Sequence, residues 1–100
     1  MTIFEAIATR KAVTADYNRG AVILAPHILY MRNDALHIDA VTIKRDGKPP
    51  REEKIGTFKL DGLTGLAITD REFPVSTLFN AEDPKYSGAA LFTVEANAAG

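Results

Sequence analysis

The sequence predicts a mainly β protein, a small SH3/Sm-like barrel of about five strands plus a C-terminal strand, behind one short α-helix. Apolar residues near the N-terminus recur at helical spacing, and from Val13 onward they alternate with polar residues in the period of two typical of strands. Turn-forming pairs such as Asn33-Asp34 separate these alternating runs at short intervals. Closing such a series of strands into a barrel removes exposed sheet edges.

The helix is expected over residues 2–10. Thr2 followed by Glu5 has the spacing of a capping box, in which the threonine caps the first turn. Phe4 and Ile7 then fall on one face. Because a helix this short is unstable alone, we expect this face to pack on the strands.

The strands are expected in short runs, with Gly20 supplying a positive φ in the first turn. Pro26 should mark a strand start, an edge or a bend because proline cannot donate to a ladder. Residues 44–54 hold many charges and two prolines and should form a mobile loop, and Asp83-Pro84 should begin one helical turn. The expected strands are 13–17, 21–25, 27–32, 35–43, 55–60, 66–69 and 90–95.

One domain over residues 1–96, with a frayed tail at 97–100, accounts for the chain. Its expected core draws apolar side chains from the helix and from most of the strands. The predicted core residues are Phe4, Ile7, Val13, Leu24, Leu29, Leu36, Ile38, Phe58, Leu60 and Leu66.

Composition and charge exclude several classes of protein. No cysteine is present, so no disulfide framework and no thiolate chemistry is expected. No apolar run approaches the ~20 residues of a membrane span, and the N-terminus lacks a signal-peptide pattern; we expect a cytoplasmic protein without membrane contact. From Arg10 to Lys59 ten basic residues face six acidic ones, whereas the rest is acidic. This argues against a general grip on DNA and leaves room for one local positive face. The alternative is a solvated surface with uneven charge.

The order of five segments resembles the WYL domain family, and the resemblance covers roughly residues 3 to 95. Three positions depart from the family pattern: Leu36 stands in place of its tryptophan, and Lys59 and Gly62 in place of two arginines. The segments are Phe4–Ile7, Val13–Tyr17, Ala25–Tyr30, Leu36–Ala40 and Thr57–Leu63.

The resemblance implies a non-enzymatic regulatory module that senses an anionic ligand, such as a nucleotide or a single-stranded oligonucleotide, on a basic barrel face. Arg32 and Lys59 would hold a phosphate, Arg32 by its bidentate fork and Lys59 as a point charge. His27 would donate a hydrogen bond, and Tyr17 would offer an aromatic face for stacking. No cofactor is expected.

Other interpretations of the same residues remain open. His27, His37 and Asp39 are the best metal-ligand set, although strand histidines are more often plain hydrogen-bonding residues. Neither a Gly-x-Ser-x-Gly nor a phosphate-cradling glycine loop occurs, so we expect no enzyme. The alternative function is a protein-interaction or self-assembly module, a homodimer for example, that acts through exposed strands. A cluster of Arg32, Lys59 and His27 would favour the ligand; a broad apolar patch would favour the partner.

Overall fold

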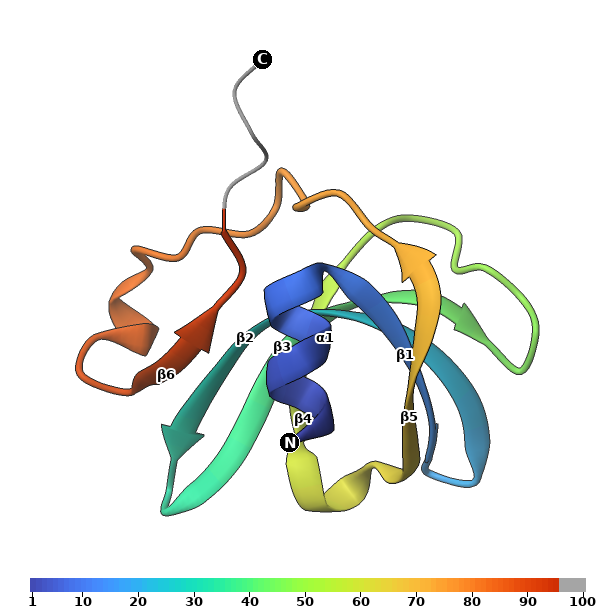
Figure 1. Ribbon diagram of the computed structural model, residues 1–100, viewed down its shortest axis with the longest axis horizontal. Coiled ribbons are helices and arrows are strands. Elements are labelled where there is room, and N and C mark those ends of the chain that lie inside the picture. Colours follow the sequence, from blue (N-terminus) through green and yellow to red (C-terminus); the bar gives the residue numbers. More distant parts are fainter. Residues whose placement is uncertain (96–100) are drawn as a thin grey trace.

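The computed structural model describes residues 1–95, and the expected tail at 97–100 lies outside them. The protein is mainly β with one short helix, as predicted (Figure 1). Two 3₁₀ turns, η1 and η2, complete the described elements, and the second begins at Pro84 as expected. In chain order the elements are α1 (Thr2–Thr9), β1 (Lys11–Tyr17), β2 (Gly20–Arg32), β3 (Ala35–Arg45), β4 (Ile55–Lys59), η1 (Leu60–Gly62), β5 (Thr64–Glu72), η2 (Pro84–Tyr86) and β6 (Ala90–Thr93).

All six strands of the described chain belong to one antiparallel sheet of order β4-β3-β2-β1-β5, with β6 paired to β2. The end strands β4 and β5 do not pair with each other, so the sheet is curved but open and a closed barrel is not confirmed. The turn η1 carries the chain between them without ladder bonds. The ring of Tyr17 from β1 packs edge-on against the ring of Phe58 from β4, with centroids 5.1 Å apart.

The two strands expected at 21–25 and 27–32 form one continuous strand, β2, and Pro26 lies inside it. Pro26 still falls at an irregular point of the strand's edge, one of the positions expected for it. On one edge β2 pairs with β1 as far as Leu24 and with β6 from Ile28 onward. Pro26 falls between these two partners, so its missing N–H interrupts no ladder on that edge. A register shift between Pro26 and Ile28 accommodates the change of partner and leaves His27 as the extra residue of a bulge.

Two local predictions near the N-terminus are wrong. The helix is capped by Met1 without a side-chain bond, and Thr2 is already helical, so no capping box forms. In the first hairpin, Asn18 and Arg19 adopt the positive φ values, 48° and 64°, and Gly20 begins β2 instead. Gly20 serves a close approach: a Cβ there would lie 3.2 Å from Nη2 of Arg45.

The core lies between the inner face of the sheet and α1, which contacts β1, β2, β5 and β6 (Figure 1). Phe4 is a correction to the predicted core: it is 38% exposed and rests against the Phe92 ring, with centroids 5.3 Å apart. Leu36, Leu60 and Leu66 are half-buried at the margin of the core. The predicted core residues that are fully buried are Ile7, Val13, Leu24, Leu29, Ile38 and Phe58.

The outer face of β2 and β3 is also covered. Residues 73–89, called the cover segment below, run from the end of β5 past this face to β6 (Figure 1). Tyr86 packs against Tyr30 there and completes a second, smaller core with Ile28. Among residues 1–95, no helix is long and apolar enough to cross a membrane.

Candidate functional site

The structure does not bring the four predicted ligand-binding residues together. Tyr17 is half-buried against Phe58, whereas Arg32 and Lys59 are exposed at the ends of β2 and β4. His27 is completely buried. Within residues 1–95, no hydrogen bond or ring contact joins His27 to any of the other three.

His27 is a fixed structural group rather than a surface donor. Its Nδ1 lies 2.8 Å from the carbonyl oxygen of Ala25, and the backbone N–H of Ser76 donates to its Nε2 at 3.0 Å. The acceptor role of Nε2 means that Nδ1 carries the proton and donates to Ala25. Burial lowers the pKa of His27 below its usual value, although the Ala25 bond and the charge of Glu53 oppose this. His27 is therefore neutral at physiological pH.

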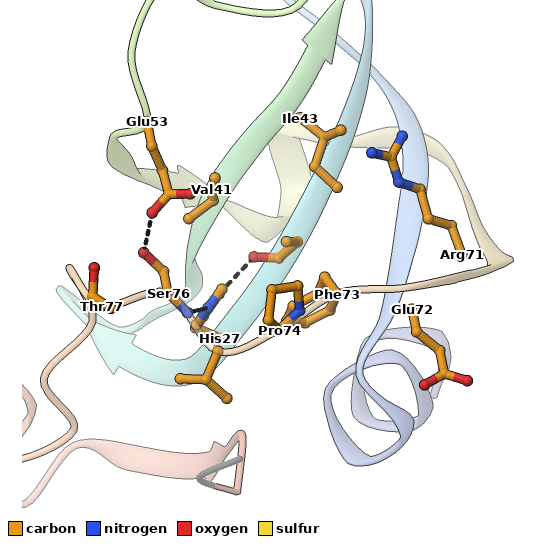
Figure 2. Close-up of a pocket in the computed structure, with 12 residues that line it drawn as sticks. His27, Val41, Ile43, Glu53, Arg71, Glu72, Phe73, Pro74, Ser76 and Thr77 are labelled. Atoms are coloured by element: carbon orange, nitrogen blue, oxygen red, sulfur yellow. Dashed lines mark hydrogen bonds between the residues drawn. The ribbon is translucent and has the colours of Figure 1, made fainter.

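A pocket of about 480 Å³ opens beside His27, between β3 and the first part of the cover segment (Figure 2). We call it the His27 pocket. The hydroxyl of Ser76 donates to Oε2 of Glu53, which ties the loop before β4 to the cover segment. Its apolar lining is Ala25, Val41, Ile43, Phe73, Pro74 and Val75, and its polar lining is His27, Glu53, Arg71, Glu72, Ser76 and Thr77.

Asp39 anchors the other end of the cover segment. This carboxylate is completely buried, and Tyr30 and Thr57 each donate a hydroxyl to its Oδ1 at 2.7 Å. The hydroxyl of Tyr86 donates to Oδ2, and Nζ of Lys85 lies 2.8 Å from the same oxygen. Each oxygen of the Asp39 carboxylate therefore accepts from two donors. A buried charge is stable only when its polar atoms are satisfied in this way.

The donors also determine how this cluster titrates. Burial alone would raise the pKa of Asp39, but the bonds from Lys85, Tyr86, Tyr30 and Thr57 outweigh it and hold the pKa below its ordinary value. Burial and the neighbouring carboxylate raise the pKa of Tyr86. Asp39 is therefore an ionised structural anchor. Within the described residues, it forms no metal cluster with His27 and His37.

A second hollow, of about 440 Å³, lies on the basic part of the chain, and we call it the basic groove. Three cations and one carboxylate line it. Arg45, Lys48 and Lys54 supply the positive charge, and within residues 1–95 none of their charged ends forms a salt bridge or side-chain hydrogen bond. The remaining lining residues are Thr42, Pro49, Pro50, Glu52 and Gly56.

The backbone places two of these cations opposite each other. Arg45 and Lys48 form an isolated antiparallel bridge, with N–H donations to each other's carbonyl at 2.8 and 3.0 Å. Asp46 in the turn between them is held by Ala21, whose N–H donates to the Asp46 carboxylate at 3.0 Å. Side chains directly opposite in such a pair are close, and like charges there repel. The groove therefore carries a net positive charge, with three cations against the carboxylate of Glu52, and the Asp46 carboxylate lies near the Arg45 guanidinium beside Gly20.

Sequence reasoning missed most of these residues. It treated residues 44–54 only as a loop, although its charge excess and the Asp46-Gly47 turn indicate that Arg45 and Lys48 face each other. Arg71 and Ser76 carry no local signal, because their position depends on where the cover segment crosses the sheet. Comparison of the chain with protein-family models, curated proteins and solved structures finds no match.

Proposed function

We propose that the protein is a WYL-type regulatory module, not an enzyme, that binds a phosphate-bearing anion such as a nucleotide or a short oligonucleotide. The proposed site is the basic groove rather than the exposed ends of β2 and β4. The observation that carries it is the facing pair Arg45 and Lys48, beside which Lys54 adds a third cation. An anion bound between like charges removes their repulsion and gains charge-assisted hydrogen bonds.

The expected affinity is modest. Each charge-assisted contact contributes about 1.5–3 kcal/mol, and exposure of these side chains favours the lower end. After the cost of association, two or three such contacts support binding in the micromolar range. Because the groove is open to solvent, added salt should weaken the complex.

We also propose that the chain is a WYL domain and that its open sheet is an SH3/Sm-like barrel. A helix followed by the curved order β5-β1-β2-β3-β4, with η1 between β4 and β5, supports an SH3/Sm-like barrel that is open on one side. The resemblance to the WYL family spans these elements. Leu36 packs at the core margin, and Gly62 lies against the Tyr17 ring, where a Cβ would sit 3.5 Å from its Cε1.

The polar residues of the His27 pocket support a role without catalysis. A serine nucleophile needs its hydroxyl bonded to a general base that a third group orients. Here His27 binds the backbone N–H of Ser76, and the hydroxyl of Ser76 donates to Glu53 instead. This arrangement fixes a chain segment and leaves the imidazole with no free nitrogen.

Amide chemical shifts followed during titration with ATP and with a short oligothymidine test the proposal. We expect shifts in residues 42–56, and we expect them to disappear in the double variant Arg45→Gln/Lys48→Gln. The charge-matched control Arg32→Gln/Lys59→Gln should bind as the natural protein does. If the control abolishes binding and the groove variant does not, the ligand lies at the predicted ends of β2 and β4.

The second candidate is the protein-interaction module. Among residues 1–95, the end strands β4 and β5 each have a single ladder partner, so each presents an open edge to them. Absence of any shift with both nucleotide probes, together with a concentration-dependent increase in mass by analytical ultracentrifugation, would favour this second function.

A further inference from the structure

We propose that the His27 pocket is a second ligand site, for a zwitterion with an apolar body, the chemistry of a short apolar peptide with free termini. The pocket is separate from the basic groove, and no residue lines both. Its volume of about 480 Å³ lies within the range of ordinary small-molecule sites.

The floor of the pocket is apolar and neutral. Val41 and Ile43 come from β3, and Phe73 lies beside the His27 ring with centroids 5.1 Å apart. Because His27 is neutral and both of its ring nitrogens are bonded, it contributes a flat wall and no charge. Such a surface favours the apolar part of a ligand.

Opposite charges flank this floor. Figure 2 shows Glu53 on one side and Arg71 on the other, with Val41 and Ile43 between them. The guanidinium of Arg71 has no partner within residues 1–95. Glu53 uses Oε2 for the hydroxyl of Ser76 and keeps Oε1 for another donor. A ligand ammonium therefore fits the Glu53 side, and a ligand carboxylate fits Arg71, which binds carboxylates bidentately.

Glu72, the remaining charged residue that lines the pocket, does not change this separation of negative and positive charge. Glu72 also lines the pocket, but its side chain points away from the apolar floor in Figure 2, and its carboxylate lies 3.9 Å from Nζ of Lys11. Among the described residues Arg71 is the single cation that lines the pocket. The ligand orientation is therefore defined by two groups, Glu53 and Arg71.

The walls are already in place before a ligand arrives. Ser76 is held from three directions: its N–H by His27, its hydroxyl by Glu53, and its Oγ by the N–H of Leu78 at 3.1 Å. A wall fixed in this way reduces the ordering cost of binding. The pocket is thus suited to a small ligand rather than to a segment that must fold on binding.

Titration calorimetry and amide shifts with the dipeptide Leu-Leu test the site on the full chain. We expect shifts at Val41, Ile43 and Thr77. N-acetyl-Leu-Leu lacks the ammonium and Leu-Leu amide lacks the carboxylate, so each should bind about fivefold more weakly or worse. Arg71→Gln should weaken the binding of Leu-Leu but leave the affinity for Leu-Leu amide unchanged. Glu53→Gln should weaken the binding of Leu-Leu but leave the affinity for N-acetyl-Leu-Leu unchanged.

Two control variants keep the result specific. Glu52→Gln changes a neighbouring carboxylate that lines the basic groove, and Arg32→Gln removes an arginine outside the pocket. Neither should change the affinity for Leu-Leu. Equal affinity for the three peptides, binding unaltered in Arg71→Gln, or no binding at all would overturn the proposal. The blocked peptides give this answer even if a variant fails to fold, and failure here leaves the basic groove untouched.

Discussion

Removing the hydroxyl of Tyr86 should measurably destabilise the protein although no apolar contact is lost. Tyr86 is buried, its hydroxyl donates to Asp39, and its ring packs edge-on against Tyr30 with centroids 5.1 Å apart. Tyr86→Phe retains the ring and leaves Asp39 with its bonds from Tyr30, Thr57 and Lys85. The lost bond to a buried charge contributes about 1.5–3 kcal/mol.

The measurement is the free energy of unfolding from denaturant titration. A domain of this size unfolds with about 5–15 kcal/mol, so Tyr86→Phe should remain folded. The comparison variant is Lys85→Met, which removes an ion pair whose lysine side chain is 49% exposed. Because its partner Asp39 is completely buried, this loss should be similar in size, about 1–3 kcal/mol. If both variants unfold at the denaturant midpoint of the natural protein, Asp39 does not anchor the cover segment.

Three further predictions concern pH, packing and the loop. The folded pKa of His27 lies below its unfolded value of 6.5, so the unfolded chain binds the proton more readily. The contribution of neutral His27 to the free energy of unfolding is therefore complete above pH 6.5 and decreases as the pH falls below it. An unchanged denaturant midpoint between about pH 7.5 and about pH 5 would contradict this. Ile38→Ala should cost about 3–5 kcal/mol through lost burial and a cavity, and an unaltered midpoint would mean that Ile38 faces solvent. Limited trypsin should cut first after Arg51 or Lys54, which are exposed outside regular structure; first cuts within the strands would argue against it.

Most local signals in the sequence predicted the fold correctly, although the capping box at Thr2 and the positive φ at Gly20 did not form. Period-two alternation located the strands, and Asn33-Asp34 forms the tight turn expected of it, with both φ values positive. The predictions failed where tertiary context decides. Pro26 is tolerated inside a strand because β2 changes partner there, and Phe4 is left at the margin because α1 turns it toward β6.

The candidate site was less predictable for the same reason. The sequence suggested Asp39 only as a candidate metal ligand. Nothing nearby in the sequence reveals that the cover segment, which follows much later in the chain, supplies Lys85 and Tyr86 to its carboxylate. The sequence suggested His27 as a hydrogen-bond donor at a binding surface, but in the structure its Nε2 accepts from the backbone N–H of Ser76. The basic groove, by contrast, was within reach of sequence reasoning, since Arg45 and Lys48 flank a two-residue turn.

The most direct test of the central claim is the stability of Lys48→Gln in chloride and in phosphate, at matched low ionic strength. If Arg45 and Lys48 repel each other across the turn, the variant should be as stable as the natural protein or more so in chloride, by up to about 1 kcal/mol. It should also lose the additional stabilisation that phosphate or tripolyphosphate gives the natural protein. General salt effects cancel because both proteins experience them equally. A variant that is less stable in chloride, and that gains as much from phosphate as the natural protein, would contradict an anion site in the basic groove.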